Sequence, residues 1–218
     1  MRFPTPKKYP GKILLFAAGL FLLATAMALL SASRLGMTPV QSLAYVLYCR
    51  FEDFISFGTL CFLWNMLLLL LQLILLRRNF KAYDFLQIPL SLFFGSVVDA
   101  AKWVFAFVAP QSLFARIAVM LLGVLILSFG VFLMLKAEFV LNSGEAAVRA
   151  ISIVTKKSFG TIKNYFDLST VCLALICSFV LFGTWRSDIV GAATLTCSIL
   201  TGLLVKLLTK LLEGTAAT

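Results

Sequence analysis

The strongest constraint on this chain is a series of apolar runs of about 20 residues, the length that a helix needs to cross a bilayer core of roughly 30 Å. The first run, from Ile13 to Ser33, is too long for the core of a signal peptide and lacks a convincing cleavage site. We expect it to remain in the protein as a helix. Only 13% of the 218 residues are charged, about half the share found in soluble domains. The sequence therefore predicts an all-α, polytopic membrane protein.

Six of these runs predict transmembrane helices, and two shorter segments predict short helices between them. The spans are expected at 13–33, 60–76, 85–108, 114–135, 162–182 and 189–212, and the short helices at 40–51 and 143–155. The Lys and Arg residues, which produce a net charge of +10, gather at helix ends, as the positive-inside rule requires. They lie mainly before the first span, between the second and third, and between the fourth and fifth. We therefore expect both termini in the cytoplasm, and no nucleic-acid partner.

Two breaks, each directly after a long apolar run, organise the chain. In the first, Thr38 is expected to cap a new helix, with Pro39 as its first residue and Gln41 as the capping-box partner. In the second, Asn142 and Glu145 repeat the cap and the acceptor three positions on. One interpretation is a pair of well-capped turns between membrane helices. The other is a pair of broken, re-entrant-type helices that line one site.

The two halves of the chain resemble each other, since the sequence Ser-Phe-Gly-Thr occurs at 56–59 and again at 158–161. Further equivalent pairs are Gly19 with Gly123 and Gln41 with Glu145 at an offset of 104, Asn65 with Asp167 at 102, and Gly95 with Gly202 and Asp99 with Lys206 at 107. We expect a single membrane domain over 1–218, with repeats at 13–108 and 114–212. Because each repeat holds three spans, the second must enter the membrane from the opposite side, which makes the repeats inverted.

Ionisable side chains inside membrane helices are costly, so each is a candidate for function. Asp99 is expected either to pair with Lys102 three residues on or to bind a solute or a coupling ion. The same choice applies to Asp167, which follows Lys163 by four residues. Glu145 suits a helix dipole as well as a cationic group or a proton. The candidate solute-binding residues are Thr38, Gln41, Asn65, Asp99, Asn142, Glu145 and Asp167.

Several of these segments together resemble the YczE-like family of bacterial integral membrane proteins. The similarity lies in Leu35-Gly36-Met37-Thr38-Pro39, Ile55-Ser56-Phe57-Gly58-Thr59, Leu86-Gln87-Ile88-Pro89 with Gly95 and Asp99, Gly144-Glu145 with Val148-Arg149-Ala150, and Phe159-Gly160. The resemblance implies a multi-pass protein of the bacterial cytoplasmic membrane. It also implies a Ser-Pro-Trp-Asp-like run at the first break, where this chain has Thr38-Pro39-Val40-Gln41 and therefore lacks the acid.

Several classes of chemistry have no residues to support them. The chain contains no His, which removes His-based triads, HExxH zinc sites and imidazole relays. The five Cys form no CxxC pair and mostly lie in apolar runs, so we interpret them as buried apolar residues. No Ser, Cys or acid has the spacing of a known catalytic set. We expect no enzyme activity, no metal and no cofactor.

The sequence favours a secondary transporter that moves a small solute across the inner membrane, coupled to an ion or to protons. The expected contacts are membrane lipid and the solute, with a homodimer or an energising partner as further options. A first alternative is a solute-capturing subunit that docks on a separate energising module through Ala24, Ala28 and Ala32 of the first span. A second is an accessory protein that transports nothing.

Overall fold

The computed structural model describes residues 10–137, 139, 140 and 142–213. Within them the chain forms eight α-helices and three short 3-10 helices, without a strand. Six helical stretches are long and apolar enough to cross a membrane, which confirms the predicted all-α, multi-pass class. Residues 1–9 of the expected basic segment before the first helix lie outside the described part of the chain.

The observed helices follow the predicted order. Their bounds are α1 Pro10–Ser33, α2 Ser42–Phe51, α3 Phe57–Leu76, α4 Gln87–Val104, α5 Leu113–Ala137, α6 Ser143–Thr155, α7 Phe159–Phe182 and α8 Ala192–Glu213, with the 3-10 helices η1 Pro39–Gln41, η2 Arg77–Asn79 and η3 Ala82–Leu86. The expected end of the third span at 108 is wrong, because α4 stops at Val104. Turns at 105–108 then lead to Pro110, which lacks the N–H that would continue a helix.

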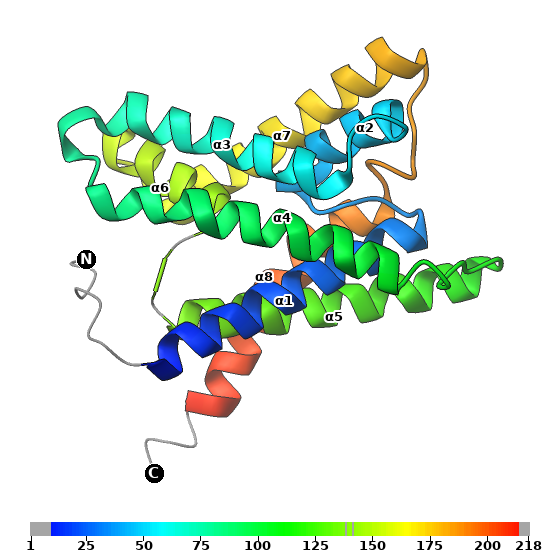
Figure 1. The fold of residues 1–218 in the computed structure, drawn as a ribbon, viewed down its shortest axis with the longest axis horizontal. Coiled ribbons are helices and arrows are strands. Elements are labelled where there is room, and N and C mark those ends of the chain that lie inside the picture. The colour runs from blue at the N-terminus through cyan, green and yellow to red at the C-terminus, as the bar shows by residue number, and fades with distance from the viewer. Residues whose placement is uncertain (1–9, 138, 141, 214–218) are drawn as a thin grey trace.

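The most extensive contact in the molecule joins α1 to α5, the first helices of the two halves (Figure 1). A Cβ added to Gly19 would lie 2.9 Å from the carbonyl oxygen of Gly130, and one added to Gly123 would lie 3.5 Å from that of Ala26. The two helices therefore run antiparallel. The offset of 104 relates Gly19 to Gly123 and Ala26 to Gly130, so the two contacts are equivalent in the two halves. A pseudo-twofold relation therefore holds at the centre of the bundle.

The alanine stripe of α1 faces the interior. Ala24 and Ala28 are both buried, because small side chains let the neighbouring helices approach closely. This surface of α1, which the first alternative needs for docking an energising module, therefore packs against other helices of the same chain.

The two short helices pack across the halves. The short helix α6 packs on α3, and its counterpart α2 packs on α7. In Figure 1, α2 lies at one end of the bundle, while α6, the start of α1 and the end of α8 lie towards the other. Each short helix thus packs on a long helix of the other half.

The repeated Ser-Phe-Gly-Thr sequence marks the start of a long helix in both halves, as predicted. The Ser56 hydroxyl accepts a hydrogen bond from the Thr59 N–H at 3.1 Å at the start of α3. The Ser158 hydroxyl accepts from the Thr161 N–H at 3.3 Å at the start of α7. Both serines are N-caps, which explains why this tetrapeptide occurs twice.

Candidate functional site

Each break is held by a connecting segment from the other half. In the first break, the Met37 N–H donates to the Ile189 carbonyl at 3.0 Å, and the Ala193 N–H donates to the Leu35 carbonyl at 2.8 Å. Gly36 between them has φ +115, and a Cβ there would lie 2.7 Å from the Gly191 nitrogen, so only glycine suits this position. In the second break, the Tyr83 hydroxyl donates to the Phe139 carbonyl.

The two breaks meet inside the protein. A Cβ added to Gly144 would lie 2.9 Å from Cγ1 of Val40, so the missing side chain lets the two segments touch. Val40 and Gly144 are separated by 104 residues, the offset that relates the halves. The pseudo-twofold axis therefore passes between them. This contact places the start of α6 against η1, as the interpretation of two broken helices around one site requires.

The predicted side-chain caps of the breaks are wrong. Thr38 and Asn142 do occupy the N-cap positions, but over the described residues neither side chain makes a capping hydrogen bond. The first new helix starts as the 3-10 turn η1, and Gln41 is 2% exposed. Its side chain is turned into the protein interior, where neither amide atom has a partner in the described part of the chain.

A small cavity opens beside the second break. Its lining residues are Phe16, Leu20, Asn65, Gln87, Leu90, Ser91, Phe94, Met134, Val140, Asn142 and Ser143. The cavity has a volume of about 10 Å³, which suffices for about one water. Asn65 is 1% exposed, and neither its Oδ1 nor its Nδ2 has a hydrogen-bond partner among the described residues. The neighbouring Trp64 Nε1 is likewise unpaired within them.

Four buried polar residues around this cavity were missed at the sequence level. Gln72 of α3 and Gln87 of α4 exchange amide hydrogen bonds of 3.2 and 3.0 Å. The Gln72 amide also donates to the carbonyl of Ser143 at 3.3 Å, and the hydroxyls of Ser91 and Ser143 lie 3.4 Å apart. The available signal was an amide within each apolar run, since buried polar groups inside membrane helices need partners. These bonds tie the start of α6 to α3 and α4.

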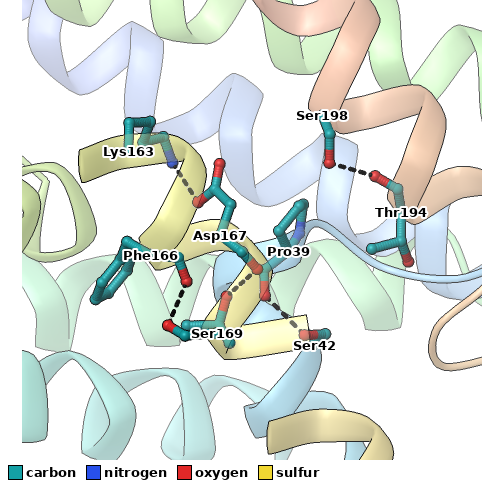
Figure 2. Close-up of polar contacts among 9 residues, drawn as sticks. Pro39, Ser42, Lys163, Phe166, Asp167, Ser169, Thr194 and Ser198 are labelled. Atoms are coloured by element: carbon teal, nitrogen blue, oxygen red, sulfur yellow. Dashed lines mark hydrogen bonds and ion pairs between the residues drawn. The ribbon is translucent and has the colours of Figure 1, made fainter. Parts of the chain in front are cut away.

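An ion pair on α7 lies near the first break. The Lys163 ammonium binds the Asp167 carboxylate at 2.7 Å, so the expected pair on α7 forms. Figure 2 shows this pair on α7 near Pro39 and Ser42, with Thr194 and Ser198 of α8 to the right. The 3-10 helix η1 contacts both α7 and α8. Glu145, in the first turn of α6, is half-buried. Burial raises the pKa of Glu145 above its ordinary value; Lys163 opposes this shift and Asp167 adds to it.

Asp99 lies apart from the breaks and joins two helices. One carboxylate oxygen accepts from the Gly58 N–H at 2.7 Å, and the other accepts from the Ser56 hydroxyl at 2.5 Å. The expected pair with Lys102 does not form within the described residues, because the Lys102 ammonium sits 3.6 Å from the centre of the Tyr48 ring. Asp99 thus provides a negative charge at the N-terminus of α3, where the helix dipole favours one.

The contact line between α3 and α4, which we call the α3–α4 seam, has an open counterpart between α7 and α8 in the second half. In the first half, α3 and α4 pack so closely that a Cβ on Gly95 would lie 2.5 Å from the Gly58 carbonyl oxygen. Their equivalents Gly160 and Gly202 are exposed, and the described residues place nothing within 4 Å of a Cβ at either. At the position equivalent to Asp99, α8 carries the exposed Lys206. Lys206 therefore does not supply the second half with a counterpart of the Asp99 carboxylate at the helix start.

The chain belongs to the family of unknown function DUF6198, whose pattern matches residues 10–210. No curated protein matches the chain. No solved structure matches it either.

Proposed function

We propose that this member of the family is a secondary transporter that moves a small solute across the bacterial inner membrane, with both termini in the cytoplasm. The solute site lies between the repeats, where the two breaks meet. The motifs shared with YczE-like membrane proteins support the same localisation. Coupling to protons would involve Glu145 beside the Lys163–Asp167 pair, since Glu145 is the half-buried acid nearest the breaks.

The observation that carries the proposal is a pair of amides, Gln41 and Asn65, which have no partner among the described residues and lie close to two helix starts. Each buried polar group without a partner costs about 1–3 kcal/mol, and irregular backbone at membrane depth persists where it is buried in protein or lines a cavity. A purely structural core of this size would gain stability from apolar side chains at both positions. A solute that hydrogen-bonds to these amides accounts for their presence.

The unequal seams support movement between two states. Inverted repeats that hold different conformations at one time can exchange them, and this exchange opens the central site to opposite sides of the membrane. Here the α3–α4 seam is closed by Gly58, Gly95 and Asp99, whereas α7 and α8 do not pack along each other over their described lengths. The outer end of α8 is fixed on the first break through Ala193. We therefore assign the movement to α8 relative to α7, within the limits set by the packing of α8 on α5.

Ligand-dependent thermal stability of the purified protein tests the site. We would screen amino acids, vitamins and organic anions against wild type, Asn65→Leu and a matched control, Ser96→Ala. Ser96 is exposed and bonds only to its own helix. At least one compound should stabilise wild type and the control but not Asn65→Leu, although the unliganded Asn65→Leu protein should melt at the same or a higher temperature. Failure of every compound to stabilise wild type, or equal stabilisation of Asn65→Leu, would sink the proposal.

Spin-label distances between α7 and α8 test this movement. Labels at the exposed positions Tyr165 and Leu203, in a background without the native cysteines, should report two distance populations. Lys206→Asp should enrich the shorter one, because a carboxylate there can cap α7 as Asp99 caps α3. The neutral variant Lys206→Gln is the control. A single distance that Lys206→Asp leaves unchanged would refute movement of α8.

A further inference from the structure

The cavity beside Asn65 shows which chemical class of solute the site takes. None of its lining residues carries a charge: five are amides or hydroxyls and six are apolar. A charged solute in this space would lose its water and gain no counter-charge, which disfavours binding of an ion. The lining alone therefore favours an uncharged molecule with both a polar and an apolar part.

The polar atoms of the lining are not equally available. Gln87 is already bonded to Gln72, and Ser91 lies within hydrogen-bonding distance of Ser143. Asn65 is 1% exposed and has an acceptor and a donor group without partners among the described residues. Asn65 lines the cavity, so its amide can bond to a molecule that fills it. A ligand that satisfies both amide groups donates one hydrogen bond and accepts another.

The start of α6 supplies the remaining donors. Ser143, the first residue of the helix, lines the same cavity, and the first N–H groups of a helix have no partner within it. Such a helix start also attracts anions. Here, however, Glu145 already places a carboxylate in the first turn, so a second negative charge would be repelled. A carbonyl oxygen, which is polar but uncharged, fits this position.

We infer that the solute is a small uncharged molecule with a carbonyl oxygen beside an N–H or O–H donor, of the amide type, and that Asn65 selects it. The inference rests on the proposed transport function and names the class of solute for that site. In the present conformation the space admits a molecule no larger than about one water. Entry of a larger amide therefore requires the lining helices α1, α3, α4 and α5 and the start of α6 to move apart.

Three molecules of matched size test this selection: propionamide, propionate and propylammonium. Binding would be measured by calorimetry and by thermal stabilisation of the full chain at neutral pH, with wild type, Asn65→Leu and Ser96→Ala. Propionamide should bind wild type and Ser96→Ala with similar affinity and bind Asn65→Leu about tenfold more weakly, because hydrogen bonds to the amide are lost. The two ions should bind none of the three proteins measurably.

Several outcomes would overturn the inference. They are tighter binding of propionate or propylammonium than of propionamide, equal binding of propionamide by Asn65→Leu, or no binding of any of the three. These failures differ from failure of the transport function. If a charged compound from the wider screen stabilises wild type but not Asn65→Leu, the site stands and only the assigned class is wrong. If no compound of any class stabilises the protein, both fail.

Discussion

Replacing Gly95 or its counterpart Gly202 by alanine should have opposite effects. A Cβ on Gly95 would lie 2.5 Å from the carbonyl oxygen of Gly58. Ordinary contact begins at 3.4 Å, so α3 and α4 must separate by 3.4 − 2.5 = 0.9 Å. Both clashing groups belong to helix backbones, which cannot relax independently. The separation also lengthens the hydrogen bonds from Gly58 and Ser56 to Asp99.

Overpacking of this kind costs about 1–3 kcal/mol. In both variants, alanine adds about 0.5–1 kcal/mol to the free energy of unfolding because it suits a helix interior better than glycine. The two variants should therefore differ in this free energy by the overpacking cost alone. For a chain of this size, 1 kcal/mol corresponds to about 2–4 °C in melting temperature. Gly95→Ala should therefore melt at least about 2 °C below Gly202→Ala in the same detergent. Equal melting temperatures would refute the claim that α3 and α4 pack closely whereas α7 and α8 do not.

Three further predictions concern charged groups and topology. Asp99→Asn should lower the free energy of unfolding by about 1.5–3 kcal/mol, the value of charge-assisted hydrogen bonds, and adding Lys102→Met should restore none of it, which double-mutant unfolding would check. Because burial raises the pKa of Glu145, its stabilising contribution is present below its ordinary value of 4.5 and falls as the pH rises through the raised value. Glu145→Gln should flatten that fall in melting curves, and an unchanged pH profile would contradict the assignment. Reporter fusions after Asn79 and at the C-terminus should both report cytoplasm, and a periplasmic signal at either would contradict the orientation.

The sequence was informative where length and local chemistry decide the structure. Six long apolar runs became the six candidate spans, since a bilayer dictates that length. The serines of the repeated tetrapeptide act within three residues of themselves, so their capping role is local. The offset of 104 also relates Val40 to Gly144, which touch at the axis. Inverted repeats bring equivalent residues together there.

The failures involve contacts between distant segments. Asp99 bonds to residues 41 and 43 positions away, so its local neighbour Lys102 was a misleading partner. The amide pair of Gln72 and Gln87 likewise depends on how α3 and α4 pack. The capping box at Gln41 was wrong because a 3-10 turn starts the segment and the side chain is buried. Burial of this amide depends on how η1 packs against distant helices, which has no local sequence pattern.

Uptake by proteoliposomes is the most direct test of the central claim. The labelled compound would be the one that most stabilises the purified wild-type protein, with Ser96→Ala and Asn65→Leu reconstituted at equal density. The account predicts saturable uptake by wild type and Ser96→Ala, and uptake about tenfold lower in Asn65→Leu, because the solute loses its hydrogen bonds to the amide. Binding without uptake by wild type, or equal uptake by Asn65→Leu, would contradict it.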